Sequence, residues 1–187
     1  MRGGDANDSH LALAAAAFAG LYGLLALPVL WWQQPSLEGL LASAVLALAL
    51  AALSAIDVRD YRLPDVLTLP LAAAGLLASW WAGESPLWWH VVSAVIGFAL
   101  LAGLASAYRY ARGRDGLGLG DAKLLAASGA WLGAEALPVV LMWACGAAIV
   151  GLLIAGWRSK EFSATTRIPF GPFLAFGTWL VWLYGSA

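Results

Sequence analysis

Two aspartates lie where apolar stretches of the sequence meet polar ones. Asp57 follows the apolar run 37–56, and Asp121 precedes the run 122–132, directly after Gly120. Ionisable groups at membrane helices are costly, roughly 2.5–3.5 kcal/mol for a charged aspartate at a helix centre, and they often mark functional sites. Two facing carboxylates can hold one proton between them, because like charges a few ångströms apart do not both ionise easily.

A carboxylate pair of this kind can cleave a peptide bond. The ionised member takes a proton from water and the protonated member donates to the scissile carbonyl, without a metal, thiol or imidazole. The chain has a single cysteine, Cys145, and its histidines, His10 and His90, are far apart, so we expect no metal and no cofactor. In the alternative interpretation, Asp57 is the first polar residue after a helix, and Asp121 is an acid favoured by the helix dipole.

The composition places these aspartates in a membrane protein. Of 187 residues, 62% are hydrophobic and 11% are charged, against roughly 25% charged in soluble domains. The mean hydropathy is +0.80. These values exclude a disordered chain, a disulfide-stapled mini-protein and a nucleic-acid-binding protein, and they argue against a soluble globule. We expect one integral-membrane domain over residues 1–187.

Apolar runs predict an all-α, polytopic bundle of about seven transmembrane helices. They cover residues 11–32, 37–56, 66–82, 88–107, 122–132, 136–157 and 170–184. A helix needs about 20 residues to cross the hydrocarbon core, so the fifth run is short. It is either a re-entrant segment or a short crossing shielded by its neighbours. The first run has no typical cleavage site, and we expect it to be retained.

Charge sets the expected orientation. With a cytoplasmic N-terminus, seven crossings place every Lys and Arg on the cytoplasmic side, as the positive-inside rule requires. Asp57 and Asp121 then lie at that same face. Tryptophans near the opposite helix ends predict an interfacial belt. They are Trp31, Trp32, Trp80, Trp81, Trp88, Trp89, Trp131 and Trp182.

Three segments, in order, resemble the type IV prepilin peptidases, which are intramembrane aspartyl proteases of the Gly-x-Gly-Asp type. Residues 116–133 resemble the family's hallmark region, residues 56–70 its aspartate and Leu/Ile-Pro-Asp signature, and residues 167–175 a third segment. The resemblance implies a six-helix peptidase core over residues 37–187, with residues 1–36 as an extra N-terminal helix. The site residues that the resemblance implies are Asp57, Pro64, Asp65, Gly118, Gly120, Asp121, Pro169 and Gly171.

Roles follow from this resemblance. Asp57 and Asp121 are implied to be the catalytic pair. In the Pro64-Asp65 turn, Asp65 is expected to cap the next helix. Lys123 is expected only to anchor the helix at the interface.

The remaining matched positions are expected to shape the site. Gly118 and Gly120 would allow a tight turn and close approach of the substrate backbone. Pro169 and Gly171 are expected to shape a helix entrance near the two aspartates.

The implied function is removal of the basic leader from type IV prepilins or pseudopilins, in pilus assembly or type II secretion. The implied place is the cytoplasmic (inner) membrane, with the active site near its cytoplasmic face and lipid around the bundle. The sequence lacks the paired Cys-x-x-Cys motifs associated with N-methylation, so we expect a peptidase without methyltransferase activity. The alternatives are an inactive pilin-binding assembly factor and a small membrane transporter.

Overall fold

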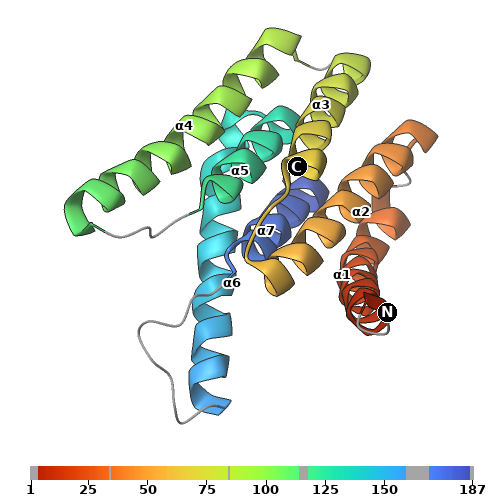
Figure 1. Ribbon diagram of the computed structural model, residues 1–187. Helices are drawn as coiled ribbons and strands as arrows, with labels where there is room; N and C mark the ends of the chain where they lie inside the picture. The colour runs from red at the N-terminus through yellow and green to blue at the C-terminus, as the bar shows by residue number, and fades with distance from the viewer. Residues whose placement is uncertain (1–3, 34, 84, 114–117, 159–168, 186–187) are drawn as a thin grey trace.

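The protein is a bundle of α-helices (Figure 1). The computed structural model describes residues 4–33, 35–83, 85–113, 118–158 and 169–185. Regular structure in these residues comprises seven α-helices and one 3-10 turn. They are α1 Gly4–Gln33, α2 Leu37–Asp60, α3 Asp65–Ala82, α4 Leu87–Arg112, α5 Leu119–Leu132, η1 Ala134–Ala136, α6 Leu137–Arg158 and α7 Gly171–Tyr184. The predicted all-α, polytopic architecture is confirmed.

Two helices differ from the others in length and burial. Within the described residues, α1, α2, α3, α4 and α6 each contain a stretch long and apolar enough to cross a membrane. The helices α5 and α7 have 14 residues each and extend about 21 Å, less than the roughly 30 Å hydrocarbon core. Most of their residues are buried in the bundle, where α5 packs against α3, α4 and α7. The short fifth run is therefore surrounded by neighbouring helices.

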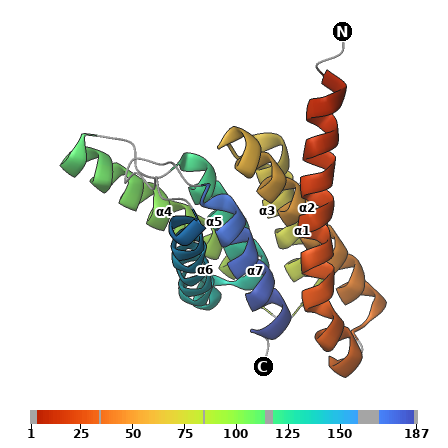
Figure 2. The same ribbon diagram turned by 90° about the horizontal axis from the view of Figure 1, so that it is seen from below.

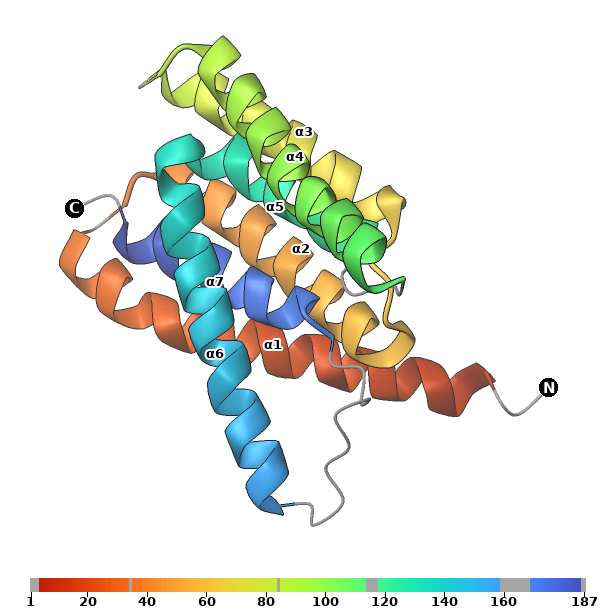
Figure 3. The same cartoon turned by 90° about the vertical axis from the view of Figure 1, so that its left-hand side faces the viewer.

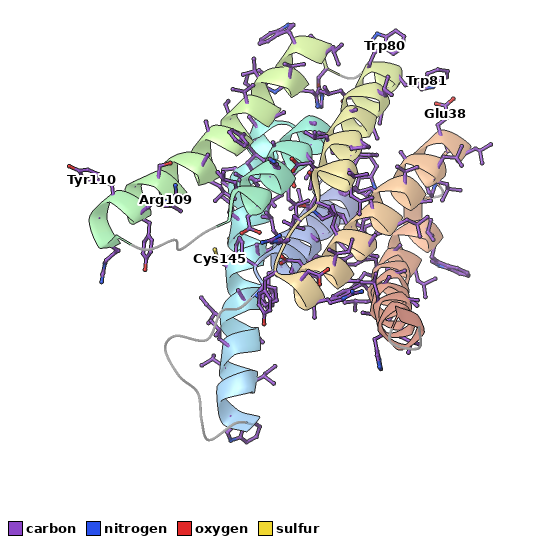
Figure 4. The ribbon with its side chains drawn as sticks, viewed as in Figure 1. Glu38, Trp80, Trp81, Arg109, Tyr110 and Cys145 are labelled. Atoms are coloured by element: carbon purple, nitrogen blue, oxygen red, sulfur yellow. The ribbon has the colours of Figure 1, made fainter. Side chains whose placement is uncertain are left out.

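The basic residues that the structure describes gather at one end of the bundle. The end of α2, the start of α3, the end of α4 and the start of α7 lie at one end of the bundle (Figure 3). Arg109 lies near that end, whereas Glu38, Trp80 and Trp81 lie at the opposite end (Figure 4). The other described basic residues belong to helix ends or connections beside it, and they are Arg59, Arg62, Arg112 and Lys123. The side chains of Arg2, Arg114, Arg158, Lys160 and Arg167 lie outside the described residues.

Small residues let α4 and α5 touch through their backbones. An added Cβ on Gly97 would lie 2.6 Å from the carbonyl oxygen of Leu125, and one on Gly129 would overlap the carbonyl of Ser93. Glycine at both positions therefore permits this close packing. The contact fixes the position of α5, the helix whose first turn contains Asp121.

Buried polar side chains join α5 to its other neighbours. The hydroxyls of Ser128 and Thr178 are 2.7 Å apart, which connects α5 to α7. The indole N–H of Trp131 donates to the carbonyl of Leu71 on α3 at 2.8 Å. Trp131 is only 5% exposed, so its assignment to an interfacial belt is wrong. Its indole nitrogen is satisfied inside the bundle, whereas Trp81 is exposed as predicted.

The N-terminal helix is part of the same packing. Figure 2 shows α1 alongside α2. The side chain of Tyr22 is fully buried, and its hydroxyl lies 3.2 Å from Ser54 on α2. The indole of Trp179 on α7 donates to the carbonyl of Tyr22 at 3.0 Å. These contacts attach α1 to α2, which contains Asp57, and to α7.

Candidate functional site

Asp57 and Asp121 line one hollow at the end of the bundle. Asp57 belongs to the last turn of α2 and Asp121 to the first turn of α5. Both side chains are buried, at 6% and 8% exposure. The hollow has a volume of about 370 Å³, and we call it the aspartate hollow. It is lined by Asp57, Tyr61, Arg62, Leu63, Pro64, Gly118, Leu119, Gly120 and Asp121.

The end of α2 is set by Tyr61 and the connection that follows it. Tyr61 adopts the left-handed conformation with φ 52° and ψ 36°, which is uncommon for a non-glycine residue. Its N–H donates to the carbonyl of Asp57 at 3.0 Å and closes the helix. Leu63 precedes proline, which disfavours a helical backbone, and Pro64 is the N-cap of α3. Asp57 therefore faces a short connection rather than a continuing helix.

Asp57 is held by the start of α7. The backbone N–H of Gly171 donates to Oδ2 of Asp57 at 2.9 Å. The N-cap residue of α7, Phe170, supplies no side-chain cap, so Asp57 satisfies one of the free N–H groups that every helix start presents. An added Cβ on Gly171 would lie 2.6 Å from that same Oδ2. Gly171, expected to shape the site, thus contacts Asp57 directly.

Asp121 is buried to a similar extent as Asp57 and lies outside the five candidate spans. Burial, followed by the nearby charge of Asp57, raises the pKa of Asp121 to about 7. The backbone of Gly118 opposes this effect without cancelling it. The raised pKa favours the protonated form of Asp121 compared with an exposed carboxyl group, which suits a group that shares a proton with a neighbour.

The glycines before Asp121 lie beside the connection between α2 and α3. An added Cβ on Gly120 would lie 2.9 Å from Cβ of Leu63, so glycine at this position permits the close approach of Leu63. Gly118 is the N-cap of α5 and has an extended backbone. Gly116, the first glycine of the hallmark region, lies outside the described residues.

Asp65 does not cap α3. The N-cap position belongs to Pro64, which has no side-chain donor or acceptor, and Asp65 is the first helical residue. The carboxylate of Asp65 instead accepts from Nζ of Lys123 at 2.5 Å. Lys123, expected only to anchor the interface, therefore joins α5 to α3. The sequence does not reveal this pair because the two residues lie 58 positions apart.

Pro169 was a predicted site residue, whereas two residues that line the aspartate hollow were not. Pro169 is half-buried and lies just before α7, whereas Arg167 and Ile168 lie outside the described residues. Tyr61 and Arg62 line the aspartate hollow and were not among the predicted site residues. Their only signal in the sequence is their position between Asp57 and Pro64.

Potential metal ligands are dispersed in the described part of the chain. No three His, Cys, Asp or Glu side chains form a group there that could hold a metal ion. Nδ1 of His90 lies 3.1 Å from the carbonyl of Ala130, and Cys145 is exposed on α6. The polar groups available to a ligand in the aspartate hollow are therefore the two carboxyl groups, Tyr61, Arg62 and backbone atoms.

Fold and site together define a class. The chain is a polytopic helical membrane protein in which two separate helices bring a pair of buried carboxyl groups to one end of the bundle. A family model described as the Type IV leader peptidase family matches residues 44–155, and the chain belongs to this family.

Curated relatives extend the match. The chain is 46% identical over 147 residues to a prepilin leader peptidase/N-methyltransferase of Burkholderia pseudomallei strain 1026b, covering 78% of this chain and 47% of the relative. For the proteins of the same name in Aeromonas salmonicida strain A449 and Pseudomonas putida, identity is 43% over 150 residues and 35% over 165 residues. These matches cover 80% and 87% of this chain, and 51% and 56% of the relatives. The chain thus spans about half the length of these relatives. No solved structure matches it.

Proposed function

We propose that this chain is an intramembrane aspartyl endopeptidase that removes the basic leader from type IV prepilins or pseudopilins. The observation that carries the proposal is the shared hollow of Asp57 and Asp121. The family and the names of the relatives, prepilin leader peptidases, support the substrate class.

The mechanism assigns different roles to the two carboxyl groups. Asp57, whose Oδ2 receives the Gly171 N–H, accepts a proton from the attacking water. Asp121, with a pKa of about 7, donates its proton to the carbonyl oxygen of the scissile bond. The water oxygen bonds to the carbonyl carbon and gives a gem-diol. The C–N bond then breaks as the leaving nitrogen takes the proton held by Asp57, and one hydroxyl of the gem-diol returns a proton to Asp121. This cycle uses protein side chains and water only.

The proposed membrane placement follows from charge. The described basic residues lie at the same end of the bundle as the aspartate hollow, which favours a cytoplasmic position for that end and an inner-membrane location. Large apolar side chains are exposed on the long helices. A substrate helix would lie against them in lipid, with its leader at the aspartate hollow.

The proposal assigns cleavage, and not methylation, to these 187 residues. The relatives are named for both activities and are about twice as long. Cys145, the one cysteine of this sequence, is exposed on α6 and cannot form a Cys-x-x-Cys motif. Incubation of the purified chain with prepilin and a methyl donor should give a cleaved product with an unmethylated N-terminus, as measured by mass spectrometry.

The deciding experiment is leader cleavage by purified single variants in lipid vesicles. We expect Asp57→Asn and Asp121→Asn each to lower the rate by at least about 100-fold, because each removes one proton-transfer group. The matched control is Asp60→Asn, an exposed aspartate at the same end of α2, which should cleave normally. Activity should also survive a metal chelator and alkylation of Cys145.

Three results would reject this function. Normal cleavage by either aspartate variant would remove the pair from the mechanism. Prepilin binding without cleavage by the unmodified chain would indicate a pilin-binding assembly factor. Loss of activity with the chelator would indicate metal-dependent chemistry.

A further inference from the structure

An ion pair outside the aspartate hollow joins the two helix starts beside it. Nζ of Lys123 on α5 lies 2.5 Å from Oδ1 of Asp65 on α3. The two side chains are 31% and 55% exposed, and neither residue lines the hollow. The pair is therefore a link between elements rather than a wall of the site.

The link acts on the segments that hold the two carboxyl groups. Lys123 follows Asp121 by two positions on α5, so its ammonium and the Asp121 carboxyl belong to the same helix start. Asp65 directly follows Leu63 and Pro64, the connection by which α2 and Asp57 reach α3.

A second contact lies between the same two segments. Leu63 packs closely onto Gly120: a Cβ added to Gly120 would lie 2.9 Å from the Cβ of Leu63. The apolar contact brings the connection against α5, and the ion pair attaches it one turn further along. Together they leave α5 little freedom to slide or turn relative to the end of α2.

We propose that Lys123 and Asp65 are positioning residues that hold Asp121 at its working distance from Asp57. This inference rests on the proposed peptidase function. An exposed ion pair contributes little to overall stability, so its loss should leave the fold intact. Misplacement of a reacting group by about 1 Å can nevertheless cost about 100-fold in rate. The pair should therefore matter for kcat and not for folding.

The test is a double-mutant cycle on prepilin cleavage in vesicles, with kcat, KM and thermal unfolding measured for each variant. Lys123→Gln and Asp65→Asn should each lower kcat by about 10-fold or more, within the range that small displacements produce. KM and the unfolding temperature should not change, because the pair lies outside the aspartate hollow. The double variant should be no slower than the slower single variant, since both remove the same link.

Charge reversal separates positioning from a direct effect of the lysine charge. The variant with both Lys123→Asp and Asp65→Lys rebuilds the link with opposite polarity, and it should recover most of kcat. The matched control is Arg59–Asp60, an ion pair of 3.4 Å with similar exposures of 33% and 49%, which lies within α2. Arg59→Gln and Asp60→Asn should leave kcat unchanged.

Several outcomes would overturn the inference. These are unchanged kcat in both single variants, additive losses in the double variant, a changed KM with constant kcat, or no recovery on charge reversal in a variant that folds. They differ from failure of the proposed function. If Asp57→Asn and Asp121→Asn abolish cleavage while the single variants of the pair cleave normally, only the positioning role is wrong.

Discussion

The N–H of Gly171 at the start of α7 donates to Oδ2 of Asp57 at the end of α2, over a distance of 2.9 Å. The carboxylate of Asp57 thus accepts a hydrogen bond from the first turn of α7, where the N-cap residue supplies no side-chain cap. Because the partial positive charge of a helix lies at its N-terminus, this arrangement favours negative charge on the carboxylate that receives the bond. The third segment matched by sequence therefore acts on the first of the two aspartates.

Gly171→Ala should impair cleavage. An added Cβ would lie 2.6 Å from Oδ2 of Asp57, so the carboxylate must turn away and the hydrogen bond must lengthen. We expect a loss of about 10-fold or more in kcat. The matched control is Gly103→Ala on α4, where an added Cβ meets nothing within 4 Å. Equal rates for the two variants would contradict the proposed role of Gly171.

Gly120→Ala should also slow cleavage, through a different contact. The new methyl would press on Cβ of Leu63, an atom without rotational freedom to move aside, and would separate α5 from the α2–α3 connection. We expect a lower kcat and a loss of about 1–3 kcal/mol in the free energy of unfolding. Gly146→Ala on α6 meets nothing within 4 Å, so a similar effect there would show that the changes are unspecific.

The pH dependence of cleavage should report Asp121. Its pKa is raised to about 7, so the group keeps its proton below that pH and loses it above. If Asp121 is the proton donor, kcat/KM should fall as pH rises through about 7, because the pH profile of kcat/KM reports the ionisations of the free enzyme. A profile that rises to a plateau between about pH 6 and pH 9 would assign the donor role elsewhere.

The same group should make stability depend on pH. A carboxyl group whose pKa is higher in the folded state binds more protons folded than unfolded between its ordinary pKa and about 7. Its contribution is therefore fully present below that interval and is lost as pH rises through it. Asp121→Asn should remove this component from unfolding measured in detergent at pH 4 to about 8. An unchanged pH dependence in the variant would contradict the raised pKa.

Trp131→Phe should destabilise the bundle. The change removes the hydrogen bond to the carbonyl of Leu71 and part of a buried ring, which should lower the free energy of unfolding by about 1–3 kcal/mol. The control is Trp81→Phe, because Trp81 is exposed at a helix end. Circular dichroism during unfolding measures the stability of both variants. Equal free energies of unfolding would contradict a stabilising role for the buried Trp131 side chain.

Much of the architecture could be predicted because hydropathy is a local property of the chain. Long apolar runs imply helices wherever they occur, and α2 and α6 begin within one residue of the predicted runs 37–56 and 136–157. The short run 122–132 was harder to interpret, since its length alone does not say what surrounds it. In the structure α5, which contains this run, is packed among α3, α4 and α7.

The sequence by itself determined which residues can do chemistry: a chain poor in thiols and imidazoles has Asp57 and Asp121 at the ends of apolar runs. Only the tertiary structure decided that these two share one hollow, that Gly171 binds Asp57, and that Asp65 pairs with Lys123 instead of capping its own helix. The physical reason is distance along the chain. Helix formation and membrane burial depend on neighbouring residues, whereas these contacts join residues on separate helices and depend on how the whole bundle packs.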